Sequence, residues 1–131
     1  MSDVLLLDCE GLARLFLDQR EIVEYLAVSR RRNTPVAISA ATIVEADHGK
    51  VHPARLDRVL SRLEIEPVTA EVARLASKLL RDAGNLHGHK FAIDAMVAAT
   101  ARRLPGQVTV LTSDPEDLTL LCGPGVRIVP L

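Results

Sequence analysis

The chain opens with Val4-Leu5-Leu6-Leu7-Asp8, a run of four apolar residues that ends on a carboxylate. A short, continuous apolar run is typical of a strand that a parallel sheet buries on both faces. In open α/β sheets, ligands gather outside the carboxyl ends of the strands. The opening stretch therefore predicts a buried parallel strand with an acidic group at the edge where such folds place their sites.

The same order, a strand followed by a helix, recurs along the chain. Leu12, Leu15 and Phe16 fall at helical spacing directly after the first strand. Further strands are expected at residues 35–38, 65–68, 108–111 and 126–129, and further helices over residues 22–32, 40–47, 53–63, 69–84, 91–104 and 115–121. We therefore expect one domain over residues 1–131, a three-layer α/β/α fold with a central, mainly parallel sheet of about five strands.

Composition limits the classes of protein to which the chain can belong. The 131 residues are 48% apolar and 25% charged, as in an ordinary soluble domain, and the net charge of −1 neither indicates nor excludes a nucleic-acid partner. The aromatic content of 2% disfavours single-strand binding by base stacking alone. No apolar run approaches the roughly 18 residues of a membrane span and no signal peptide is apparent, so we expect a cytoplasmic protein with no membrane partner. Cys9 and Cys122 are expected to be free thiols.

Four carboxylates lie in or directly beside apolar runs, with no basic residue in the same run: Asp8, Glu45, Asp94 and Asp114. A buried, unpaired carboxylate costs several kcal/mol, so such groups are normally paired, protonated or bound to a metal. Two carboxylates about 4 Å apart repel by about 4 kcal/mol at an effective dielectric constant of about 20. If the fold brings the four together, a hard divalent cation such as Mg²⁺ or Mn²⁺ is the expected ligand, and hydrolysis of a phosphodiester is the expected chemistry.

Each acid also has a structural interpretation. Asp8 and Asp114 follow strands and are placed to cap the next helix, and Glu45 is placed to lie on the exposed side of a short helix. Asp94 is harder to explain in this way, because eight of the nine residues from Phe91 to Ala99 are apolar. Taken together, the four acids favour a shared site over four separate structural roles.

Four segments of the chain resemble motifs of the PIN-domain ribonucleases, especially the compact VapC-like toxins of bacterial toxin–antitoxin pairs. Each contains one of the four acids, and their order and spacing carry the resemblance. The segments are Leu5-Leu6-Leu7-Asp8, Ile38-Ser39-Ala40-Ala41-Thr42-Ile43-Val44-Glu45, Ala92-Ile93-Asp94-Ala95-Met96-Val97-Ala98-Ala99-Thr100-Ala101 and Val110-Leu111-Thr112-Ser113-Asp114-Pro115-Glu116-Asp117-Leu118.

The resemblance implies a Mg²⁺- or Mn²⁺-dependent endoribonuclease, the toxin of a pair, which forms a homodimer and is inhibited by a small antitoxin protein. It implies that the four acids are both the catalytic residues and the metal ligands, with Asp117 and Thr112 as supporting groups. The chain departs from the family pattern at Cys9-Glu10, where such toxins more often carry a small hydroxyl or amide residue. This departure leaves the role of that turn open.

Other interpretations give different expectations. A PIN-like interaction module would keep the fold without turnover, and a PIN nuclease could act in RNA processing instead of as a toxin. A phosphoryl-transfer receiver domain would need a lysine at the end of the last strand, and residues 126–130 contain none. The segment 84–90 lacks the spacing of a phosphate-binding P-loop.

Two groups of basic residues have open roles. The histidines His48, His52, His87 and His89 lack the tight spacing of a zinc site. His87, His89 and Lys90 precede the Asp94 segment and either contact substrate phosphate or belong to a solvated loop. The run from Arg30 to Arg32 either contacts RNA or an acidic partner, or is a solvated helix end.

Overall fold

The computed structural model describes residues 3–47, 49–86 and 88–131. Within these residues, five strands form a sheet in the order β3-β2-β1-β4-β5, and every neighbouring pair is parallel. The opening run of the chain is the central strand. The strands are β1 (Val4–Leu7), β2 (Val36–Ser39), β3 (Glu64–Glu66), β4 (Val108–Thr112) and β5 (Arg127–Pro130). The expected parallel α/β sheet is confirmed.

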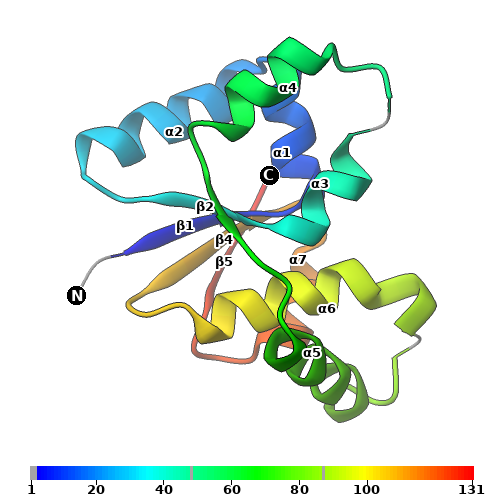
Figure 1. Ribbon diagram of the computed structural model, residues 1–131. Helices are drawn as coiled ribbons and strands as arrows, with labels where there is room; N and C mark the ends of the chain where they lie inside the picture. The colour runs from blue at the N-terminus through cyan, green and yellow to red at the C-terminus, as the bar shows by residue number, and fades with distance from the viewer. Residues whose placement is uncertain (1–2, 48, 87) are drawn as a thin grey trace.

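Helices cover both faces of the sheet and give the three layers seen in Figure 1. One layer consists of α1 (Cys9–Phe16), α2 (Arg20–Arg31) and α4 (Pro53–Leu60), and the other of α5 (Ala70–Asp82), α6 (Gly88–Arg103) and α7 (Pro115–Cys122). The short helix α3 (Ala40–Ala46) packs against both α1 and α6, and so connects the two layers. In the described part of the chain, no helix is long and apolar enough to cross a bilayer.

Alternate residues of β1 face the two helical layers. Leu5 and Leu7 pack in the apolar cluster that includes α1 and α2, whereas Val4 and Leu6 pack in the cluster that includes α5, α6 and α7. All four side chains are buried, which explains why the strand is apolar throughout instead of alternating with polar residues. Asp8 is the first residue beyond this core.

The register of the sheet determines where the chain leaves it. Leu7 lies level with Ile38 of β2 and with Leu111 of β4. Because the three strands are parallel, the segments that follow them emerge at one edge of the sheet. These segments carry Asp8, the start of α3 and the Ser113-Asp114 turn.

Some element boundaries differ from those expected. Helix α6 begins at Gly88 instead of residue 91. The first N–H groups of a helix have no intrahelical acceptor, so polar residues are tolerated in its first turn. Strand β3 ends at Glu66 instead of residue 68, and α4 ends at Leu60 instead of residue 63. As an edge strand with 43% of Ile65 exposed, β3 has only a weak apolar pattern.

Candidate acidic site at the carboxyl edge of the sheet

Asp8 lies at the junction of β1 and α1, where only 3% of the residue is exposed. Its Oδ1 accepts a hydrogen bond of 2.9 Å from the Gly11 amide, which caps α1, and its Oδ2 accepts one of 3.1 Å from the Ser113 amide. A Cβ at Gly11 would lie 3.2 Å from Leu7 Cβ, so this close turn suits glycine. The expected capping role of Asp8 is confirmed, and the same carboxylate also ties β1 to the turn after β4.

The surroundings of Asp8 disfavour the ionised form of its carboxyl. Burial is the largest cause and raises the pKa of its carboxyl above the ordinary value, while the bonds from Gly11, the Thr112 hydroxyl and Ser113 lower it. The nearby charge of Asp114 raises it further, and the net shift is upward. A cap alone would normally lower the pKa of an aspartate. Asp8 therefore combines a structural role with an unfavourable buried charge.

Asp94 lies in the middle of α6, where its side chain is half-buried. Burial raises the pKa of its carboxyl to about 6, and the charges of Asp114, Asp8, Glu45 and Asp117 raise it as well, in that order. Every one of these four charges is negative. The other three predicted acids thus come within electrostatic reach of Asp94, together with Asp117.

The turn after β4 presents Asp114 differently from what the sequence indicated. Asp114 occupies the N-cap position of α7, as expected, but its side chain makes no capping hydrogen bond. Instead its amide donates to the Thr112 hydroxyl at 2.9 Å, and this bond shapes the turn. The exposed carboxylate of Asp114 is consequently not used by the helix.

Glu45 lies in the last turn of α3 and is exposed, as its structural interpretation required. Its Oε2 accepts a hydrogen bond of 3.2 Å from the Cys9 thiol. Burial and the contact with Glu45 raise the pKa of the Cys9 thiol well above its ordinary value, which keeps the proton on sulfur. The contact joins α1 to α3 at the rim of the acidic site.

The donor chemistry of the site suits a hard divalent cation. The four side chains offer carboxylate oxygens. Burial raises the pKa of Asp94, and the negative charges of Asp114, Asp8 and Glu45 raise it further. Among the described residues, no three His, Cys, Asp or Glu side chains are arranged to ligate one ion directly. Mg²⁺ usually keeps several waters and uses one or two carboxylates, so the oxygen donors fit such an ion even though they do not form a closed cage.

Of the histidines, His52 has a structural role, because its Nδ1 accepts a hydrogen bond of 3.1 Å from the Ala54 amide and caps α4. His48, His87 and the side chain of His89 lie outside the described residues. The proposed contacts of His87 and His89 with phosphate therefore stay predictions. Lys90 is exposed and lies over the Phe91 ring, 5.3 Å from its centroid.

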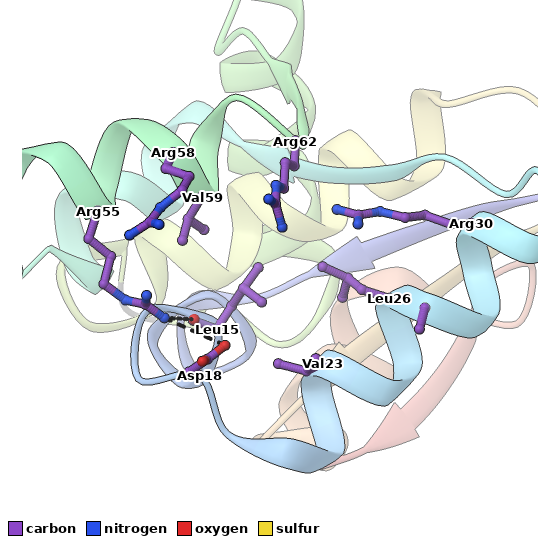
Figure 2. Close-up of a pocket in the computed structure, with 10 residues that line it drawn as sticks. Leu15, Asp18, Val23, Leu26, Arg30, Arg55, Arg58, Val59 and Arg62 are labelled. Atoms are coloured by element: carbon purple, nitrogen blue, oxygen red, sulfur yellow. Dashed lines mark hydrogen bonds and ion pairs between the residues drawn. The ribbon is translucent and has the colours of Figure 1, made fainter.

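A second feature lies at the other end of α1. A cleft of about 300 Å³ opens between α1, α2 and α4 (Figure 2). Four arginine side chains line it, together with apolar side chains from all three helices. The arginines are Arg30, Arg55, Arg58 and Arg62, and the apolar residues include Leu15, Val23, Leu26 and Val59.

The arginines of this cleft differ in how they are held. Arg55 is fixed, since its Nε donates to the Phe16 carbonyl at 2.5 Å and a terminal nitrogen lies 3.6 Å from Asp18 Oδ1 (Figure 2). Arg58, Arg62 and Arg30 extend along the rim. Of the predicted run from Arg30 to Arg32, only Arg30 lines the cleft, and Arg55, Arg58 and Arg62 were not predicted. Arg55 and Arg58 lie on α4 and Arg62 follows its end, and their spacing of three and four residues was the available signal.

The chain is similar to one known protein family and to several solved structures. The model of the PIN domain family matches residues 10–118 of the chain. A VapBC2 structure from Rickettsia felis, bound to a DNA fragment from its promoter, aligns over 98% of each chain with a TM-score of 0.70 and 16% identity. DNA-bound VapBC from Salmonella typhimurium aligns over 99% of this chain and 98% of that one, with a TM-score of 0.68 and 23% identity.

A third solved structure, FitAcB from Neisseria gonorrhoeae, covers 95% of each chain with a TM-score of 0.68 and 22% identity. At such identities the likeness to these structures concerns the fold. No match was found among curated proteins. The matched residues 10–118 include Glu45, Asp94 and Asp114 and begin just after Asp8.

Proposed function

The chain belongs to the PIN-domain family of nucleases, and we propose that it is a Mg²⁺- or Mn²⁺-dependent endoribonuclease that serves as the toxin of a toxin–antitoxin pair. The observation that carries the proposal is Asp94. Its carboxyl lies half-buried in an apolar helix segment, and its pKa rises to about 6 because of burial and, after that, the charges of four other acids. Crowding of this kind is costly unless a cation offsets it.

The side chains of the site have distinct proposed roles. Asp8, Glu45, Asp94 and Asp114 would hold the cation, which when bound lowers the pKa of a water and neutralises charge on a phosphodiester. Asp8 is preoriented for this task, because two backbone amides fix its two oxygens. Thr112 supports Asp8 through its hydroxyl, and Asp117 adds negative field at Asp94.

Removal of metal tests the proposal directly. Purified protein should cleave RNA in Mn²⁺ or Mg²⁺, lose that activity in excess EDTA, and regain it when Mn²⁺ is restored, because carboxylate oxygens are the donors of the site. Gel analysis of labelled RNA measures the cut strands. Cleavage that persists after exhaustive chelation would rule out the metal-dependent mechanism. A folded protein that neither cleaves RNA nor melts at a higher temperature with Mn²⁺ would indicate an interaction module without turnover.

We also propose a small antitoxin as the partner, and the arginine-lined cleft as the surface that receives it. The structural neighbours include VapBC and FitAB, and each of these names denotes a pair of components. The cleft offers four arginines against one acid, Asp18, around an apolar wall. An acidic, amphipathic segment complements this surface in both charge and polarity.

Two further properties follow from the family resemblance and are part of the proposal. One is a homodimer, and the other is a cytoplasmic location. The location agrees with the two free thiols, Cys9 and Cys122, in the described structure.

A further inference from the structure

The contact between Cys9 and Glu45 joins two elements that the chain separates by 36 residues. Cys9 is the first residue of α1, and its backbone is held on both sides. The preceding Asp8 donates its amide to the Leu111 carbonyl at 3.1 Å, and the Asp8 carboxylate caps the same turn through Gly11. The Cys9 thiol therefore projects from a fixed point at the rim of the acidic site.

Glu45 is less constrained by its own helix. It is exposed, and it lies in the last turn of a seven-residue helix, where the helix dipole disfavours a carboxylate. A glutamate side chain has several rotatable bonds, and ordering them opposes the binding of any ion that it would ligate. The bond from Cys9 holds one of its two oxygens, Oε2.

The chemistry of the donor matters as much as its position. A thiol is a weak, neutral donor, so it orients a carboxylate without cancelling its charge. An arginine or lysine at the same place would orient Glu45 more strongly but would also compete with a cation for it. A thiol thus suits a carboxylate that must be both aligned and fully charged.

We propose that Cys9 is a positioning residue that holds Glu45 in the conformation in which it binds the divalent cation. This inference rests on the proposed metal-dependent function of the same site. It gives a role to the residue at which the chain departs from the common family pattern, where a small hydroxyl or amide residue more often stands. It also predicts that a hydroxyl in place of the Cys9 thiol would orient Glu45 in the same way.

The test compares Mn²⁺ binding, measured by titration calorimetry, in Cys9→Ala and Cys9→Ser proteins. Loss of the donor in C9A should weaken Mn²⁺ binding by about fivefold, the factor that one modest hydrogen bond contributes. C9S keeps a donor and should stay within about twofold of wild type. Cys122→Ala removes the other thiol, which is buried in α7, and should leave Mn²⁺ affinity unchanged.

A double variant tests whether the effect passes through Glu45. In a Glu45→Ala background, C9A should have no further effect on Mn²⁺ affinity, because the side chain that Cys9 orients is gone. Wild-type affinity in C9A would overturn the inference, as would an equal loss in C9A and C9S or a full additional loss in the double variant. If instead the proposed metal-dependent function is wrong, the wild-type protein itself will bind no Mn²⁺, and this result distinguishes the two failures.

Discussion

The Asp94→Asn protein is expected to lose RNA cleavage by about a hundredfold or more, since even the outer-shell partners of metal ligands cost 10–100-fold when removed. Asn keeps the size of the side chain but removes a charged oxygen donor from the centre of the acidic cluster. The rate of RNA cleavage in saturating Mn²⁺ measures the loss. Asp57→Asn on α4 is the matched control, because it makes the same chemical change outside the acidic cluster.

The same substitution should stabilise the metal-free protein. The Asp94 pKa of about 6, against an ordinary 3.8, means that the folded state binds this proton more tightly than the unfolded state. The stability that this group contributes is present below about pH 4 and is lost as the pH rises through about 6. Asn carries no such proton, so the advantage of the variant should grow over that interval to about 1–2 kcal/mol, after allowance for solvent screening.

Urea unfolding of both proteins in EDTA, at about pH 4 and about pH 7.5, measures this difference. A structural carboxylate with a hidden partner would behave in the opposite way. The variant would then be less stable by about 1–3 kcal/mol, because the partner would lose its hydrogen bond. A variant that is less stable without metal and still cleaves RNA would refute the site described here.

Reversing two charges in the arginine-lined cleft should weaken the binding of the proposed antitoxin. In the double variant Arg58→Glu and Arg62→Glu, affinity for the proposed antitoxin should fall by about a hundredfold, since like charges across an interface cost several kcal/mol. Calorimetry or surface binding measures the affinity, and wild-type binding should weaken as salt is added.

The matched control for the cleft makes the same charge change on the other face of the sheet. Arg74→Glu with Arg81→Glu on α5 alters two exposed arginines and should leave partner affinity nearly unchanged. RNA cleavage by the cleft variant should also be unchanged, because the cleft and the acidic site lie at opposite ends of α1. A variant that binds the partner normally but has a raised KM for RNA would reassign the cleft to the nucleic acid.

The sequence was sufficient to predict the sheet because its signals are local and strong. A four-residue apolar run such as Val4–Leu7 has few alternatives to a strand that is buried on both faces. Edge strand β3 and the start of α6 were placed less well. At both positions the chain is solvent-facing or polar, so burial contributes little to the pattern.

The candidate site was predicted only in part, because some of its contacts leave no local signal in the sequence. Asp94 was identifiable because a charge in an apolar helix needs an explanation from elsewhere in the fold. The bond from the Ser113 amide to Asp8 spans 105 residues, and that between Cys9 and Glu45 spans 36, and neither leaves a periodic signal. Such contacts depend on how strands align at the sheet edge, which only the assembled fold determines.

We propose that four acids, from the end of β1, from α3, from α6 and from the turn after β4, converge on one divalent cation. Calorimetric titration of metal-free protein with Mn²⁺ tests it most directly, with Asp94→Asn measured beside the wild type. We expect saturable binding to the wild-type protein and a loss of affinity of about tenfold or more in the variant, in keeping with the cost of disturbing a metal site. Equal affinity in the two proteins, or no binding to a folded wild-type protein, would contradict the claim.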